Sequence, residues 1–99
     1  MQPRDVVIVS ACRTAIGKFQ GQFKDVPARE LAITAGKEAI RRAGVDINTI
    51  DEIVMGECYT AMQGSLPARQ VSMRIGLPIE SSAVTVNQNC ASGMRALEI

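Results

Sequence analysis

Three short apolar runs, each followed by a stretch with helix signals, constrain the fold of this chain most. The runs lie at residues 6–11, 53–56 and 81–86 and are rich in Val and Ile. A continuous apolar run is typical of a strand buried on both faces, as in a parallel sheet. Strands that alternate with helices predict an α/β fold in the order β-α-β-α-β-α.

The longest helix carries clear start and stop signals. We predict it from Pro27 to Ala43, with Asp25 as its cap and Gly44 as its stop. Glu38 and Arg42 form a favourable i,i+4 pair on its polar face. Small and branched apolar residues form one stripe at helical spacing: Ala28, Leu31, Ala32, Ala35, Gly36, Ala39, Ile40 and Ala43. We expect this stripe to pack closely against the sheet.

Two further helices are predicted from the remaining signals. One runs from Pro67 to Ile75 and ends at Gly76. The other is opened by Cys90, directly after a polar turn. The connector at residues 46–50 suggests a single helical turn. The acidic pair at 51–52 is interpreted as a solvated strand entrance, because neighbours on a strand point to opposite faces and cannot act together.

The composition argues against several classes of protein. The chain has 99 residues, a net charge of +1 and 46% hydrophobic residues, which suits one soluble globular unit. A balanced charge argues against nucleic acid or an acidic membrane as the main partner. No apolar run approaches the ~20 residues that span a bilayer. The first residues do not resemble a signal peptide, so a cytoplasmic location is expected.

The cysteines do not suggest a metal site or a disulfide scaffold. Cys12, Cys58 and Cys90 are widely spaced, and the chain has no histidine. Two of the three thiols are expected to be small buried apolar groups. A phosphate loop at Gly17 is also excluded, because Phe19 stands where Ser or Thr would be needed. No metal or cofactor is therefore expected.

Cys90 is the residue whose position suggests chemistry. It lies between the third apolar run and the third helix, and ligands in open α/β sheets gather at the carboxyl ends of strands. N–H groups at a helix N-terminus favour a thiolate and can stabilise an oxyanion. The small residues 91–93 would let a substrate approach. Spacing alone leaves two equal alternatives, a reactive thiol and an inert buried cysteine.

The stretch from Val86 to Leu97, VNQNCASGMRAL, resembles the acyl-enzyme cysteine motif of the thiolases. Three other stretches resemble the same family, in matching order along essentially the whole chain: SACRTAIGKF at 10–19, AGV at 43–45, and PARQ at 67–70 together with GLP at 76–78. The chain departs from the family pattern at Ala15, which is often proline, and at 20–22, where the loop is usually richer in glycine.

The resemblance implies the layered αβαβα thiolase fold. Residues 1–99 would supply the first β-α-β-α-β-α of its N-terminal half, an incomplete N-terminal portion that ends within the helix opened by Cys90. It also implies homodimers or homotetramers. In such an assembly the strand at about 82–86 pairs with its counterpart across the dimer axis, and the loop at 60–66 lies near that interface.

The implied activity is that of an acyl-CoA C-acetyltransferase. Cys90 would be the catalytic nucleophile that carries the acyl group as a thioester. The substrates would be acetyl-CoA or another acyl-CoA and CoA. The reaction would condense two acetyl-CoA to acetoacetyl-CoA or run the reverse thiolysis.

The resemblance also implies groups that this sequence does not contain. Family members use a histidine to activate the nucleophile and a second cysteine as acid and base. The chain has no histidine, and Cys12 and Cys58 are not in the family's C-terminal glycine-rich motif. We therefore expect the N-terminal part of a thiolase. Three alternatives stay open: a degradative 3-ketoacyl-CoA thiolase for longer chains, a non-catalytic domain that binds acyl-CoA or a partner subunit, and a redox sensor that pairs Cys90 with Cys58 or Cys12.

Overall fold

The computed structural model describes residues 2–99 and shows an α/β arrangement built on a two-stranded sheet. Its elements in chain order are α1 (Ala28–Ala43), the 3-10 turn η1 (Ile47–Thr49), β1 (Glu52–Gly56), α2 (Pro67–Ile75), β2 (Ser82–Val86) and α3 (Ser92–Glu98). The strands are parallel, with Glu52 opposite Ser82 and Gly56 opposite Val86. Their carboxyl ends therefore meet at one edge of the sheet.

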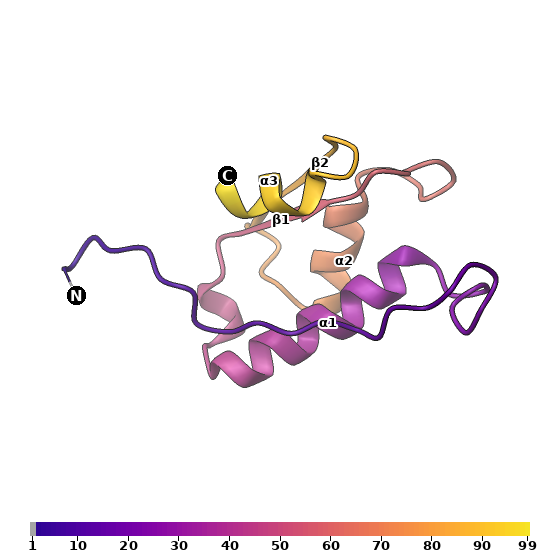
Figure 1. The fold of residues 1–99 in the computed structure, drawn as a ribbon. Coiled ribbons are helices and arrows are strands. Elements are labelled where there is room, and N and C mark those ends of the chain that lie inside the picture. Colours follow the sequence, from indigo (N-terminus) through magenta and orange to yellow (C-terminus); the bar gives the residue numbers. More distant parts are fainter. Residues whose placement is uncertain (1) are drawn as a thin grey trace.

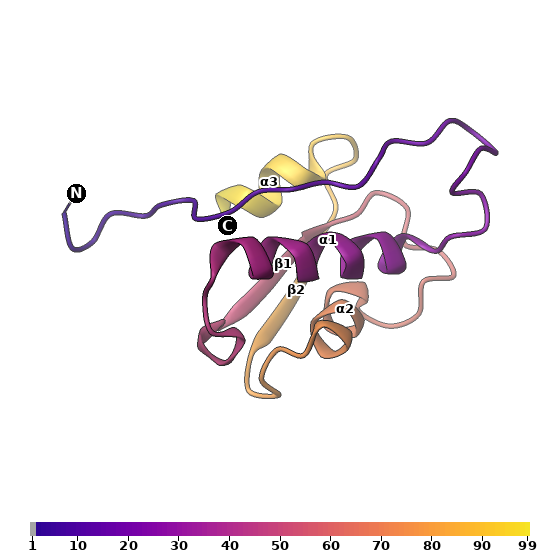
Figure 2. The same cartoon turned by 90° about the horizontal axis from the view of Figure 1, so that it is seen from below.

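The helices form layers on the two faces of this sheet. α3 lies over one face, α2 covers the other, and α1 packs against α2 (Figure 1, Figure 2). The apolar stripe of α1 therefore packs against α2 at Gly36 and faces the N-terminal segment at Ala39 and Ala43, and does not pack on the sheet as predicted. At Gly36 even one added carbon would overlap the side chain of Ile75 in α2. At the helix surface, the Arg74 guanidinium donates to both carboxylate oxygens of Glu30, at 2.9 and 3.2 Å.

The two longer helices begin and end where the sequence signals place them. Pro27 occupies the N-cap position of α1, and Gly44 ends the helix at a φ of 67°. Gly76 ends α2 at a φ of 103°. Both glycines adopt the left-handed conformation that side chains disfavour. Asp25 does not cap α1, because it lies two residues before the N-cap residue, Pro27. No side chain makes a capping hydrogen bond at this end of the helix.

The prediction of a buried strand at residues 6–11 is wrong. The segment pairs with no strand among the described residues, and Val6 is 99% exposed. It runs alongside α1 instead (Figure 2), where the Cys12 thiol donates to the Ala35 carbonyl at 3.1 Å. A β-branched run becomes a strand only when a neighbouring strand offers backbone partners. The observed order is thus α-β-α-β-α.

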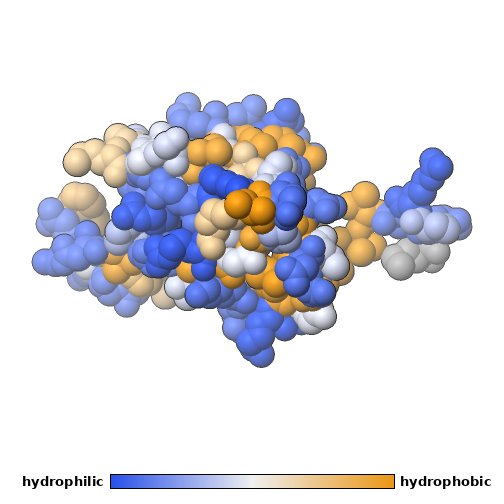
Figure 3. Space-filling view, turned by 180° about the vertical axis from the view of Figure 1, so that it is seen from behind, coloured by the Kyte–Doolittle hydropathy of each residue, from blue (hydrophilic) through white to orange (hydrophobic). Residues whose placement is uncertain are grey.

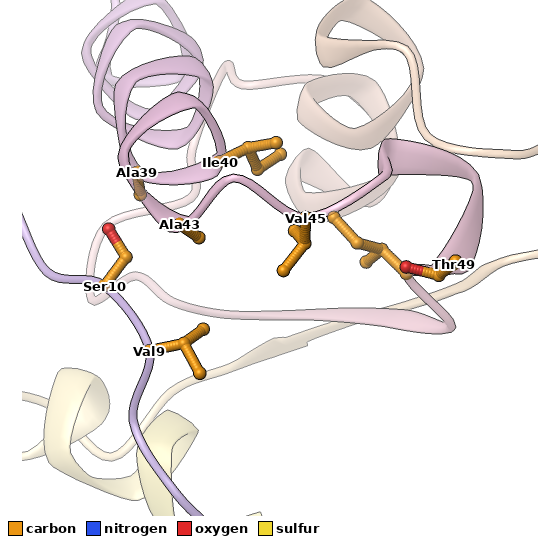
Figure 4. Close-up of a pocket in the computed structure, with 8 residues that line it drawn as sticks. Val9, Ser10, Ala39, Ile40, Ala43, Val45 and Thr49 are labelled. Atoms are coloured by element: carbon orange, nitrogen blue, oxygen red, sulfur yellow. The ribbon is translucent and has the colours of Figure 1, made fainter.

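A groove separates the N-terminal segment from the end of α1. Val9 and Ser10 form one wall, and residues of α1, the following loop and η1 form the other, around a volume of about 390 Å³ (Figure 4). The apolar side chains of the segment stay at the surface (Figure 3). The buried apolar core is correspondingly small and consists of Ile33, Ala68, Val71 and Leu77. No helix within residues 2–99 is long and apolar enough to cross a membrane.

Candidate active site

Cys90 lies in the turn over residues 87–91, which joins β2 to α3. Its thiol is free and exposed, and it sits beyond the carboxyl end of the parallel strand pair. The thiol is therefore not buried among residues 2–99, and its reactivity stays a prediction. The helix begins at Ser92, with Ala91 at the N-cap, and so two residues later than predicted.

Hydrogen bonds within the turn hold it in one conformation. The Asn87 side-chain oxygen accepts from the Asn89 N–H at 2.9 Å. The Ser92 hydroxyl accepts from the Gln88 N–H at 2.9 Å and donates to the Asn89 carbonyl at 2.6 Å. Asn89 adopts a φ of 52°, in the left-handed region that Asn tolerates better than most residues. The polar residues before Cys90 therefore form the tight turn that their sequence predicts.

Two N–H groups that could have supported an oxyanion are occupied. The Ala91 N–H donates to the Gln88 carbonyl and the Ser92 N–H to the Asn89 carbonyl, both at 3.1 Å. These are the backbone donors that directly follow the nucleophile. The expected stabilisation by the start of the helix therefore does not come from these two groups, because the turn itself uses them.

Cys58 anchors the turn from the neighbouring strand. It follows β1 and is half-buried. Its thiol donates to the Asn89 carbonyl at 2.6 Å and lies 3.9 Å from the Ser92 hydroxyl. Its own carbonyl accepts from the Asn87 side-chain amide at 2.9 Å. Sequence reasoning gave Cys58 only a packing role or, in one alternative, that of a redox partner of Cys90. The strand register could have placed Cys58 near the turn. Continuing the pairing of Gly56 with Val86 puts residue 58 beside residue 88.

Gly56 allows β1 to approach the start of α3. A carbon added at Gly56 would overlap the backbone carbonyl of Ser92. Ser92 is itself buried, at 3% exposure, so the two backbones have no room to separate. This close approach brings the end of β1 within reach of the turn that carries Cys90.

Glu57 and Cys12 are two further ionisable groups near the sequence motifs. Both carboxylate oxygens of Glu57 are buried, and none of the described residues gives them a hydrogen-bond partner. Cys12 lies in the N-terminal segment against α1, so of the two proposed redox partners of Cys90 only Cys58 contacts the turn. Residues 2–99 contain no group of three or more His, Cys, Asp or Glu that could hold a metal ion.

This chain is similar to the members of a known protein family. Residues 6–99 match the family model described as thiolase, N-terminal domain. The acetyl-CoA acetyltransferase of Clostridioides difficile is 50% identical over 93 residues, which cover 94% of this chain and 87% of that protein. The acetyl-CoA acetyltransferase of Paracoccus denitrificans is 45% identical over 93 residues, which cover 94% of this chain but 24% of that protein.

Solved structures agree with these sequence matches. The acetyl-CoA acetyltransferase of Syntrophomonas wolfei superposes with a TM-score of 0.91 at 52% identity, over 93% of this chain and 23% of that one. The Acat5 thiolase of Ascaris suum, solved in complex with coenzyme A, gives a TM-score of 0.90 at 36% identity, over 92% of this chain and 24% of that one. The chain spans about a quarter of the length of these structures.

Proposed function

We propose, because this chain belongs to the thiolase family, that Cys90 is the acyl-accepting nucleophile of an acetyl-CoA acetyltransferase. One observation carries the proposal: the Cys90 thiol is exposed beyond the carboxyl ends of two parallel strands, in a turn fixed by hydrogen bonds. A thiol presented in this way is open to a substrate from solvent, while its backbone is held in place.

The first half-reaction follows from thioester chemistry. The Cys90 thiolate attacks the carbonyl carbon of acetyl-CoA and forms a new carbon–sulfur bond. The tetrahedral intermediate then breaks its bond to the coenzyme A sulfur, and coenzyme A leaves as a thiolate that takes up a proton. The product is an acetyl thioester on Cys90. The names of the relatives and the coenzyme A complex of the Ascaris suum thiolase support this class of substrate.

The second half-reaction passes the acetyl group from Cys90 to another molecule. Transfer to the α-carbon of a second acetyl-CoA gives acetoacetyl-CoA, and the reverse direction is thiolysis by free coenzyme A. The condensation needs a base that removes a proton from the accepting acetyl group. The 99 residues contain no histidine for this step, so we assign to this chain only the acyl-carrying role.

We also propose that the protein is a homo-oligomer, either a dimer or a tetramer. β2 pairs with β1 on one side only, so its other backbone edge has no partner among the described residues. A free strand edge is a template for pairing with the same strand of a second copy. Sedimentation of the purified protein tests this proposal, and a monomer at micromolar concentration would contradict it.

Acetylation of Cys90 is the direct test of the proposed function. The protein is incubated with acetyl-CoA, quenched in acid, digested and analysed by mass spectrometry. We expect an added acetyl group on the peptide that contains Cys90 and none in the Cys90→Ala variant. A label on Cys12 or Cys58 instead, or none at all, would contradict the proposal. Binding of acetyl-CoA without acetylation would favour the alternative of a non-catalytic domain that binds acyl-CoA.

A further inference from the structure

We infer that Cys58 is a positioning residue for Cys90, whose thiol holds the Asn89 carbonyl and so fixes how the nucleophile is presented. The inference rests on the proposed role of Cys90 as acyl acceptor. Its basis is the hydrogen bond of 2.6 Å from the Cys58 thiol to the Asn89 carbonyl. That carbonyl belongs to the peptide group that leads into Cys90, so its direction sets the direction of the Cys90 backbone.

The conformation of Asn89 needs such external support. A residue other than glycine at a φ of 52° stores a modest conformational cost and persists only where its surroundings fix it. Three donors converge on the Asn89 carbonyl: the Cys58 thiol, the Ser92 hydroxyl at 2.6 Å and the Ser92 N–H at 3.1 Å. Losing one of these donors weakens the constraint on the peptide group, but the carbonyl still accepts hydrogen bonds from the other two.

Cys58 differs from the other two donors in its origin. Both Ser92 groups belong to the start of α3 and move with the turn. Cys58 comes from the end of β1, so its thiol links the carbonyl beside the nucleophile to the sheet. A second bond, from the Asn87 side-chain amide to the Cys58 carbonyl, uses the backbone and does not depend on the side chain at position 58. A substitution of Cys58 therefore removes the thiol contact while the turn stays attached to β1.

Cys12 provides a matched control for this contact. Its thiol also donates to a backbone carbonyl, that of Ala35, at 3.1 Å. It is likewise half-buried, but it lies against α1 and not at the turn. Removing either thiol deletes the same kind of hydrogen bond, and only one of the two bonds is next to Cys90.

The experiment compares Cys58→Ala, Cys58→Ser and Cys12→Ala with the wild type, each expressed from the complete coding sequence. The rate of Cys90 acetylation is measured at saturating acetyl-CoA by quenched mass spectrometry, together with the half-saturating acetyl-CoA concentration. Alkylation of Cys90 by iodoacetamide serves as a second readout, because a small reagent needs exposure but little alignment. Melting temperatures are recorded for all four proteins.

We expect Cys58→Ala to slow acetylation about three- to tenfold, the effect of one hydrogen bond on the orientation of the attacking group. The half-saturating acetyl-CoA concentration and the rate of Cys90 alkylation should stay within about twofold of the wild type, since acetyl-CoA binding and the exposure of Cys90 are unchanged. Cys58→Ser keeps a hydroxyl donor and should recover most of the rate. In Cys12→Ala, Cys90 should be acetylated at the wild-type rate.

Three results would overturn the inference while leaving the proposed function intact. The first is acetylation of Cys58→Ala at the wild-type rate, and the second is an equal loss in Cys58→Ser. The third is a parallel fall in alkylation and melting temperature in Cys58→Ala, because packing would then explain the loss. If the wild type itself is not acetylated at Cys90 but is alkylated there, the proposed function fails first.

Discussion

The turn that carries Cys90 and the N-terminal segment at 6–11 are both predicted from their local sequence, yet only the turn forms as predicted. In the turn, side chains within four residues of one another satisfy the backbone, and Cys58 adds one contact from β1. In the N-terminal segment, the apolar side chains find no strand beside them and stay exposed. The comparison shows that local hydrogen bonding defines a turn by itself, whereas a strand depends on neighbours that the local sequence does not specify.

The largest effect that tests the turn is expected from Gly56→Ala. The added carbon would overlap the Ser92 carbonyl, and that backbone is buried and hydrogen-bonded. We expect a loss of about 3 kcal/mol in the free energy of unfolding, the upper end for overpacking against atoms that cannot rotate away. Urea denaturation followed by circular dichroism measures it.

Gly93→Ala is the matched control for that substitution. A carbon at Gly93 meets no atom within 4 Å, and Gly93 does not adopt a positive φ. Alanine is also the better helix former, so this variant should be neutral or slightly more stable. If Gly56→Ala is no more destabilising than Gly93→Ala, β1 and the start of α3 are not in tight contact.

The next effect is expected from Ser92→Ala, which tests the internal bonds of the turn. The hydroxyl is buried and serves the Gln88 N–H and the Asn89 carbonyl at once. Its removal takes two part-buried hydrogen bonds from the turn, and we expect a loss of about 2 kcal/mol. Ser82→Ala removes an exposed hydroxyl that donates to Glu52 at 3.0 Å and should cost much less. Similar losses for the two variants would contradict the special role of Ser92.

Cys12→Ala tests how firmly the N-terminal segment is attached. The thiol makes a hydrogen bond from this segment to α1, at 3.1 Å from the Ala35 carbonyl. We expect a loss of about 1 kcal/mol or less, since one neutral hydrogen bond is removed at a half-buried site. Limited proteolysis measures the attachment directly, and the variant should be cut sooner near its N-terminus. An unchanged cleavage rate would show that the segment is held by other contacts.

The features that the sequence predicts correctly are those decided within a few residues. Gly44 and Gly76 end their helices because only glycine adopts a positive φ without cost, and Pro67 begins α2 because its missing N–H is not needed there. The polar turn that carries Cys90 lies between β2 and α3, where the sequence predicts it. The same local logic gives the bounds of β1 and β2 to within a residue or two.

The features that the sequence does not predict depend on residues far apart in the chain. Cys58 lies 31 positions from Asn89, and only the parallel register brings the two together. In the sequence, Gly56 has no feature that separates it from other strand residues. Its close contact with the start of α3 appears only in the structure. The run at residues 6–11 has strong strand propensity, but propensity does not provide the neighbouring strand that would bury it.

The smallest effect is expected from Val6→Thr, which tests the exposure of the N-terminal segment. Val6 is 99% exposed, whereas Val71 in α2 is 1% exposed. In the chain of residues 1–99, Val6→Thr should change the free energy of unfolding by less than about 0.5 kcal/mol, as is usual for surface sites. The same substitution at Val71 places a hydroxyl in the core and should cost about 2 kcal/mol. A loss at position 6 that approaches the loss at position 71 would show that the segment is buried in solution, and the contrast with the turn would then disappear.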